Sequence, residues 1–455
     1  MIVIIGAGLA GLSTALHLAD REHIVLEREP EAGGLCRSRR VGEFVFDYTG
    51  HLLHLRDPEI VGLVDRLLPG AFEQIERRAA IRSHGKLLPY PFQANTYGLP
   101  PAVVFECVHG FWKSLRDGGS GPGGPAEKSR DGSQSFHHWT LETFGDGIAK
   151  HFMFPYNRKM WLRDLRDITA DWVSWAVPKP TFEEVLRGAL GQTNTGLGYN
   201  PRFRYPKNGG IGILPAAFAE RVPNVRYGCD VAGVDVARRT VRTSSGETIR
   251  YDALVLTAPL ASFLARAEGL PDTLRELSKG LDWIDVYCLN LGIARPHVTD
   301  QHWIYFPEEV FPFYRVGSPS EFSATVAPKG CSSLYVEIAL RPADRPDEGR
   351  LVEVALDGLC RAGILQENDE IVSRDLVRLS PAYVVFDRAR RAAMGPVLET
   401  LRSLDIHPIG RFGAWTYSYM EAAIKDGIRT ARRLRGEPEG PAAVLPASGG
   451  RDRTP

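Results

Sequence analysis

The 455-residue sequence has no excess of charge of either sign and no long apolar run. Lys plus Arg and Asp plus Glu both number 55, so the chain exerts no long-range attraction on nucleic acid or anionic membranes. No apolar run approaches the ~20 residues that a membrane-spanning helix requires, and the apolar start lacks the basic region of a signal peptide. We therefore expect a cytoplasmic protein without a nucleic-acid or membrane partner.

Cysteine is also scarce. The six cysteines are scattered singly and none has metal-binding or redox spacing. A disulfide framework is therefore not expected, and we predict no metal site. The chain is too long for one ordinary core, and its length predicts about two or three packed units.

A glycine-rich turn follows the first apolar segment. Met1–Ile5 is typical of a buried parallel strand, and Gly6, Gly8 and Gly11 then form the pattern Gly-x-Gly-x-x-Gly before a helical segment. These glycines permit a tight turn and a close approach of the backbone to a pyrophosphate, which the helix N-terminus binds. Glu27, at the end of a second strand, is placed to accept hydrogen bonds from a ribose diol. The segment predicts a dinucleotide-binding site.

The residues after Glu27 favour FAD over NAD. Gly33, Gly34 and Arg37 resemble the extended fingerprint of FAD-binding proteins of the amine oxidase and glutathione reductase type. The apolar segment 252–259 resembles the strand and turn that return to the FAD domain in those folds. There is no second Gly-x-Gly-x-x-Gly with an acidic partner, so we expect no separate NAD(P)H domain.

We expect an α/β protein in which a Rossmann-like FAD-binding domain carries an inserted helical subdomain and an antiparallel β-sheet substrate subdomain. The expected FAD-binding domain is discontinuous, comprising 1–80, 205–265 and 370–436. The mostly helical subdomain is 81–204, and the sheet subdomain is 266–369. Segment 117–135 has low complexity and no apolar anchor, which predicts a mobile loop. Strands are predicted at 23–26, 253–257 and 333–339 and a helix at about 420–434, and residues 437–455 are expected to be a disordered tail.

Several motifs, taken in order, resemble the UDP-galactopyranose mutase family, and most closely its eukaryotic-like branch. They are Gly50-His51-Leu52-Leu53-His54, Tyr90-Pro91-Phe92-Gln93-Ala94-Asn95, Tyr156-Asn157-Arg158-Lys159-Met160-Trp161, Asn200 before Phe203-Arg204-Tyr205-Pro206, the segment 303–308, Phe313-Tyr314-Arg315, and Gly410-Arg411-Phe412 with Tyr417. The family lies within the wider amine oxidase and protoporphyrinogen oxidase-like flavoproteins.

The resemblance implies an isomerase that interconverts the pyranose and furanose forms of a nucleotide sugar, most simply UDP-galactose. In this family the N5 atom of reduced FAD attacks the anomeric carbon of the sugar and expels the diphosphate, with no net redox change. The expected partners are therefore a UDP-linked hexose and an external electron donor. The sequence sets no oligomeric state, and a homo-oligomer is compatible with it.

The resemblance also assigns roles to residues. His51 and Arg411 would lie beside the flavin, with Gly50 and Met420 as further cofactor contacts. The uracil pocket would comprise Tyr90, Phe92, Gln93, Asn157 and Trp161. Arg315 would clamp the diphosphate with help from Tyr305, Tyr383 and Tyr417, while Asn200 and Trp303 would lie near the sugar. His51, Arg315 and Arg411 are the expected catalytic residues.

Two positions depart from the family pattern. Ala176 stands where the family has a second diphosphate arginine, and Phe322 replaces a tyrosine. Each loss removes a donor to a charged partner, worth ~1–3 kcal/mol. Three arginines earlier in the sequence are candidates to replace the missing diphosphate arginine: Arg158, Arg163 and Arg166. Two alternatives therefore stay open: an FAD-dependent oxidoreductase of the amine oxidase type, and a non-catalytic homologue that binds nucleotide sugar.

Overall fold

The computed structural model describes residues 1–18, 21–116, 134–173, 177–194, 196–198 and 201–437. The predicted loop 117–135 and tail 437–455 lie almost wholly outside these residues. Within the described part of the chain, no helix is long and apolar enough to cross a membrane.

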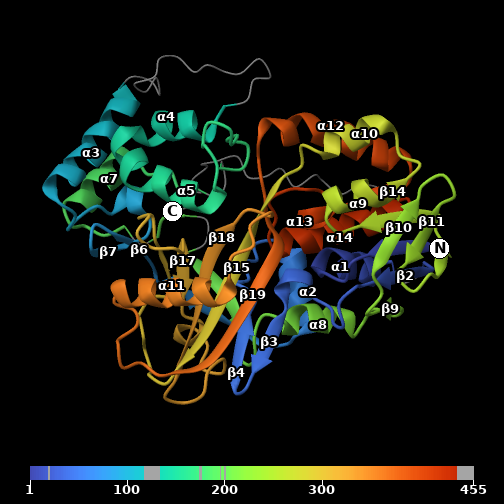
Figure 1. Cartoon of the computed structure of the whole chain (residues 1–455), viewed down its shortest axis with the longest axis horizontal. Coiled ribbons are helices and arrows are strands. Elements are labelled where there is room, and N and C mark those ends of the chain that lie inside the picture. The colour runs from blue at the N-terminus through green and yellow to red at the C-terminus, as the bar shows by residue number, and fades with distance from the viewer. Residues whose placement is uncertain (19–20, 117–133, 174–176, 195, 199–200, 438–455) are drawn as a thin grey trace.

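The dinucleotide fingerprint lies in a five-stranded parallel sheet, on the right in Figure 1. Its strand order is β20 (Ile406–Pro408), β13 (Ala253–Leu256), β1 (Ile2–Ile5), β2 (His23–Leu26) and β9 (Val225–Arg226). All four residues of β1 and of β2 are buried, as the continuous apolar runs predicted. The predicted Rossmann-like sheet is confirmed.

Closely packed helices cover one face of this sheet. Helix α1 (Leu9–His17) lies against α14 (Met420–Leu434), α8 (Ile213–Ala219) packs on α1, and α2 (Pro58–Leu67) adjoins α8 and α14. A Cβ at Gly427 would come within 2.6 Å of the Ser13 Cβ, so glycine allows the two long helices to touch. The helix predicted for about 420–434 has these bounds.

A second, seven-stranded sheet lies beside the first (Figure 1). Its order is β19 (Ile371–Val384), β15 (Trp283–Ile293), β18 (Ser332–Leu340), β17 (Arg315–Gly317), β16 (Trp303–Tyr305), β6 (Ala79–Ser83) and β7 (Lys86–Pro89). Helix α11 (Glu348–Arg361) covers its outer face with Val352, Ala355 and Leu359.

This sheet differs from the predicted boundaries in two places. Strand β19 pairs with β15 along its length, although the predicted boundary at residue 370 placed it with the FAD-binding domain. β15 is buried at nearly every residue and therefore needs a partner on each edge, which β19 and β18 provide. Likewise β6 and β7 extend this sheet, so the helical part begins after Pro89 rather than at 81.

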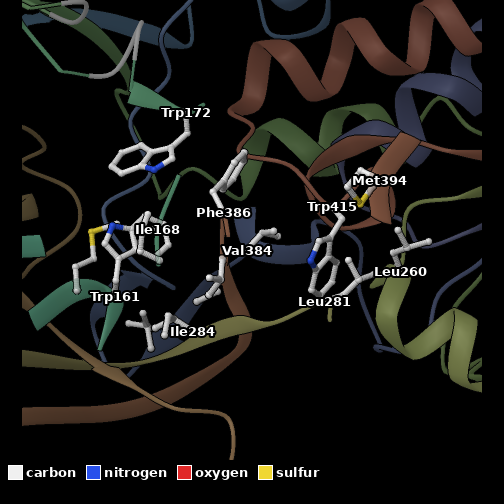
Figure 2. Packing of buried hydrophobic residues seen from close by; sticks show 14 of the residues in the cluster. Trp161, Ile168, Trp172, Leu260, Leu281, Ile284, Val384, Phe386, Met394 and Trp415 are labelled. Atoms are coloured by element: carbon white, nitrogen blue, oxygen red, sulfur yellow. The ribbon is translucent and has the colours of Figure 1, made fainter. Parts of the chain in front are cut away.

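The helical part carries α3 (Pro101–Arg116), α4 (Phe136–Ile148), the π-helical turn η3 (Ala149–Met153), α5 (Phe154–Trp161) and α7 (Phe182–Ala189). Its core is aromatic, and Figure 2 shows Trp161 and Trp172 beside Val384, the last residue of β19, and Phe386, two residues later. The same cluster continues to Trp415. A single apolar core thus joins the helical part to both sheets.

The remaining helices and strands complete the two sheets, the helical part and the connections between them. Their bounds are η1 (Gly34–Cys36), β3 (Ser38–Val41), β4 (Phe44–Asp47), β5 (Phe72–Glu76), η2 (Phe92–Ala94), β8 (Arg202–Pro206), β10 (Val231–Asp235), β11 (Thr240–Thr243), β12 (Thr248–Arg250), α9 (Leu260–Arg266), β14 (Ala267–Glu268), α10 (Asp272–Ser278), η4 (Pro319–Glu321), α12 (Arg388–Ser403) and α13 (Gly410–Gly413).

Candidate active site

A cavity of about 400 Å³ opens at the carboxyl ends of β1, β2 and β13. This edge is where parallel α/β sheets bind ligands. Most of the cofactor residues predicted from the sequence line it: Gly6, Gly8, Glu27, Gly33, Gly34, Arg37, His51, Arg411 and Met420. The fingerprint and the C-terminal Gly-Arg motif, far apart in the chain, therefore meet at one site.

The glycines of the fingerprint differ in their surroundings. A Cβ at Gly11 would lie 2.0 Å from the carbonyl oxygen of Gly6, so this glycine serves close packing of helix on strand. Gly8, in contrast, has no atom within 4 Å of its ideal Cβ position and borders the cavity. Gly50 does not line the cavity, and a Cβ added there would lie 2.3 Å from the Tyr335 hydroxyl.

The cavity fits a dinucleotide at its phosphate and ribose ends. Helix α1 begins after Gly8 with no side-chain cap and no acidic residue in its first turn, so its N–H groups remain available for an anion. The buried Glu27 carboxylate accepts hydrogen bonds from the N–H groups of Ala7, at 2.6 Å, and Glu29, at 3.0 Å. Held in this way at the cavity wall, it is placed to accept from ribose hydroxyls.

His51 and Arg411, the two residues expected beside the flavin, both line the cavity. His51 Nδ1 lies 3.2 Å from the Thr49 hydroxyl. Burial, together with the charges of Arg411 and Arg315, lowers the pKa of His51 to about 4, so the imidazole is neutral near pH 7. A neutral imidazole between two arginines can accept or donate one hydrogen bond without adding charge.

The Arg411 guanidinium lies over the faces of two tyrosine rings. It lies 4.8 Å from the ring centre of Tyr383 and 5.3 Å from that of Tyr417. Its Nη1 donates a long hydrogen bond, 3.4 Å, to the Ser418 carbonyl, and its buried Nε has no hydrogen-bond partner in the described chain. A buried donor without a partner is costly, so this guanidinium is suited to an acceptor in the cavity, such as a reduced flavin ring.

Arg315 is held by a carboxylate that the sequence reasoning missed. Its Nε and Nη2 donate to the two oxygens of Glu337, each at 2.7 Å. The Glu337 side chain is fully buried, and the two residues face each other across β17 and β18. Although burial opposes the charge on Arg315, Glu337 raises the pKa of its guanidinium. The signal was a lone glutamate within the apolar strand segment Ser333–Ala339.

Sheet register places further residues around Arg315. Tyr305 is its neighbour on β16, and Trp303 lies two residues before Tyr305 on the same face, opposite Gly317. A Cβ at Gly317 would clash with the Tyr335 ring at 2.1 Å, so the glycine makes room for this tyrosine. Tyr335, like Glu337, was not predicted, because a single tyrosine in a strand is not distinctive.

The predicted nucleotide residues gather on η2 and α5. Phe92 stacks on Phe152 with ring centres 5.1 Å apart, and Gln93 Nε2 donates to the Pro178 carbonyl at 2.8 Å while its Oε1 is buried without a partner in the described chain. Asn157 Nδ2 donates to the Met153 carbonyl at 2.8 Å. Trp161 is fully buried and packs edge-on to Tyr383.

Tyrosines connect this group to Arg315. The Tyr90 ring has the Arg77 guanidinium on it at 4.6 Å and lies 5.5 Å from Tyr305. Tyr383 and Tyr417 stack with ring centres 6.4 Å apart. The structure thus pairs Tyr90 with Tyr305 beside Arg315, and it groups Tyr383 and Tyr417 with Arg411 and Trp161.

The positions that depart from the family pattern are placed as follows. Ala176 and Asn200 lie outside the described residues. Phe322 packs on Phe203 and Tyr205 in the core rather than at the cavity.

None of the three alternative arginines lines the cavity. Arg158 is exposed over Phe154, Arg163 pairs with Asp282, and Arg166 pairs with Asp164.

Comparison with known proteins identifies the class. The model of the flavin containing amine oxidoreductase family matches residues 9–435, so the chain belongs to this family and FAD is its cofactor. The fold resembles a crystal structure of reduced UDP-galactopyranose mutase, with a TM-score of 0.89 and 26% identity over 96% of this chain and 93% of that one. This match confirms the predicted fold and the resemblance to the mutases; the eukaryotic-like branch stays a prediction.

Two further comparisons give one partial sequence match to a mutase and one match of the fold alone. The chain is 22% identical over 181 residues to dTDP-fucopyranose mutase from Escherichia coli, and the match spans 37% of this chain but only 44% of that protein. A protoporphyrinogen oxidase from Exiguobacterium shares the fold at a TM-score of 0.72 and 15% identity. The named mutases are isomerases, and the likeness groups the chain with flavin-dependent mutases.

Proposed function

We propose that this protein is a flavin-dependent pyranose–furanose mutase acting on a nucleotide-linked hexose, most simply UDP-galactose. The observation that carries the proposal is the pair of partly buried arginines, Arg411 and Arg315, whose charges both act on the neutral His51. Arg411 lies at the cavity wall and Arg315 is held by Glu337, with the neutral His51 near both. A redox-neutral reaction that expels a diphosphate requires cations at both places.

Each cation has a distinct task in this proposal. Bound reduced FAD supplies the nucleophile for the anomeric carbon. Arg411 stabilises negative charge on the ring from a position fixed by Tyr383 and Tyr417. The two hydrogen bonds from Arg315 to Glu337 use Nε and Nη2. Nη1 takes no part in them, so this nitrogen is available to the diphosphate. Because Glu337 fixes the guanidinium, little ordering entropy is lost when the substrate binds.

The nucleotide is positioned by the helical part. The buried Oε1 of Gln93 lacks a hydrogen-bond donor in the described chain, and a pyrimidine imide N–H would provide one. The Phe92 and Phe152 rings form the apolar floor beside it. These features support a uracil or thymine base, as the names of both mutase relatives also suggest.

The test is conversion of UDP-galactopyranose by dithionite-reduced protein, read by chromatography of the sugar nucleotides. We expect formation of the furanose isomer, with dTDP-fucopyranose as a second substrate candidate. Oxygen-dependent oxidation of an amine, without isomerisation, would instead indicate an oxidoreductase. Tight binding of UDP-galactose without turnover would indicate a non-catalytic homologue.

A further inference from the structure

Lys159 lies in α5 between two of the predicted nucleotide residues, Asn157 and Trp161, but its side chain contacts a different element. Its ammonium reaches the loop that joins β16 to β17. There it donates to the carbonyl oxygens of Phe306, at 2.8 Å, and Phe313, at 3.1 Å, and also to that of Glu308. One cation thus binds three backbone groups of a single loop.

This loop carries two of the predicted diphosphate residues at its ends. Tyr305 is the last residue of β16, and Arg315 is the first of β17. The loop closes on itself through a hydrogen bond from the Phe306 N–H to the Tyr314 carbonyl, 2.9 Å, and through the packed rings of Phe306, Phe311 and Phe313. A displacement of the loop therefore moves Tyr305 and Arg315 together.

A second contact joins the same two elements. Tyr156, three residues before Lys159 and on the same face of α5, meets Tyr305 edge-on at 5.5 Å and Tyr314 at 6.3 Å. To these two ring contacts Lys159, whose pKa is lowered to about 7 by burial, adds three hydrogen bonds. They are directional, so they fix the orientation of the loop as well as its distance from α5.

We propose that Lys159 is a positioning residue that sets the diphosphate-binding arginine, Arg315, at a fixed place relative to the nucleotide-binding helix α5. The inference rests on the proposed function, because it assigns α5 to the nucleoside and the β16–β17 loop to the diphosphate. A nucleoside diphosphate contacts both elements at once, whereas a nucleoside contacts α5 alone. Lys159 therefore affects the affinity for the diphosphate and leaves the affinity for the nucleoside unchanged.

The test compares the binding of UDP and of uridine by Lys159→Met in the FAD-loaded, full-length protein, using calorimetry. We expect the dissociation constant of UDP to rise about tenfold or more and that of uridine to stay within about twofold. The matched control is Lys150→Met, nine residues earlier, where an exposed ammonium pairs with Glu106. This control should bind both ligands like the parent. Lys159→Gln, which retains an N–H donor, should recover part of the lost affinity for UDP and provides a second variant if Lys159→Met does not fold.

A double-mutant cycle with Arg315→Ala identifies the route of the effect. If Lys159 acts through Arg315, Lys159→Met should cause no further loss of UDP affinity once Arg315 is removed. An equal further loss, or an equal loss for UDP and uridine, would overturn the inference. UDP binding by Lys159→Met at the parent's affinity would also overturn it while leaving the proposed function intact. A parent that binds no UDP would overturn both.

Discussion

At the scale of single residues, the site depends on one guanidinium held by one carboxylate. Removing Arg315 should leave a diphosphate in a partly closed site without its close counter-charge, and should also leave Glu337 buried without its partner. We expect Arg315→Ala to cost about 2–5 kcal/mol in UDP binding, roughly 30-fold or more. Arg315→Lys should recover little, because an ammonium cannot form the two-pronged contact. Calorimetry with UDP measures both variants.

The exposed Arg158, on the neighbouring helix, provides the control for that experiment. Arg158→Ala should bind UDP like the parent, because its guanidinium is exposed to solvent and lies over the Phe154 ring. The opposite result, in which Arg158→Ala loses affinity and Arg315→Ala does not, would place the diphosphate elsewhere.

The partner of Arg315 should contribute to stability. Glu337 is fully buried and, within the described part of the chain, forms its ion pair with Arg315, so Glu337→Gln leaves this cation without a counter-charge. Breaking such a pair typically costs about 3–5 kcal/mol. We expect the midpoint of urea unfolding to fall accordingly, whereas Asp357→Asn, in an exposed pair with Arg361, should change it little. Equal midpoints for both variants would contradict this account.

The sequence predicted the site residues that belong to motifs. It missed those whose role depends on a residue of the neighbouring strand. Gly8, Glu27, His51 and Arg411 were predicted, and all four line the cavity. Glu337 and Tyr335 were not, because their importance depends on strand register, which pairs each with a residue on β17. A residue far away in the sequence that becomes a neighbour only through sheet pairing leaves little local signal.

At the scale of elements, the β1–α1 turn should be necessary for FAD binding but not for folding. The Cβ position of Gly8 meets no protein atom, so Gly8→Val fills cavity space without an internal clash. We expect a folded, colourless protein, assessed by circular dichroism and by the flavin absorbance. Gly395→Val is the control, since Gly395 also has no atom within 4 Å but lies on α12, away from the cavity. A yellow Gly8→Val protein with full flavin would refute the assignment.

The bounds of elements were predicted well where the apolar pattern is continuous. The predicted strands at 1–5, 23–26, 253–257 and 333–339 and the helix at 420–434 agree with β1, β2, β13, β18 and α14 to within one or two residues. The predicted place of β19 in the FAD-binding domain was wrong, since β19 pairs with β15 in the seven-stranded sheet. The sequence of this segment shows which side chains are apolar, but not which strand lies beside it. Sheet membership is a tertiary property and is weakly encoded in any one strand.

At the scale of the whole molecule, stability should fall in mild acid. His302 is 2% exposed, and its Nδ1 accepts a hydrogen bond from the Arg78 N–H. Burial, with the charge of Arg78, lowers the pKa of His302 to about 3, so the folded state binds fewer protons than the unfolded state between pH ~3 and 6.5. The free energy of unfolding should therefore decrease as the pH falls through this window, by at most about 1.4 kcal/mol per pH unit for this histidine.

Urea unfolding at pH 7, 6 and 5 measures this dependence, and His302→Asn, which retains an acceptor, should weaken it. His51 and His54, whose pKa values burial lowers to about 4, add to the same trend. A free energy of unfolding that is constant between pH 7 and 5, or the same slope in parent and variant, would contradict the burial of a neutral His302.

The central claim for the whole molecule is that a flavoprotein catalyses a reaction without net redox change. The most direct measurement follows the flavin spectrum and the sugar nucleotides together, under anaerobic conditions, during conversion of UDP-galactopyranose. We predict that the reduced protein completes many turnovers while its flavin stays reduced, and that the oxidised protein is inactive until it is reduced. Equal turnover by oxidised, reduced and flavin-free protein would contradict the account.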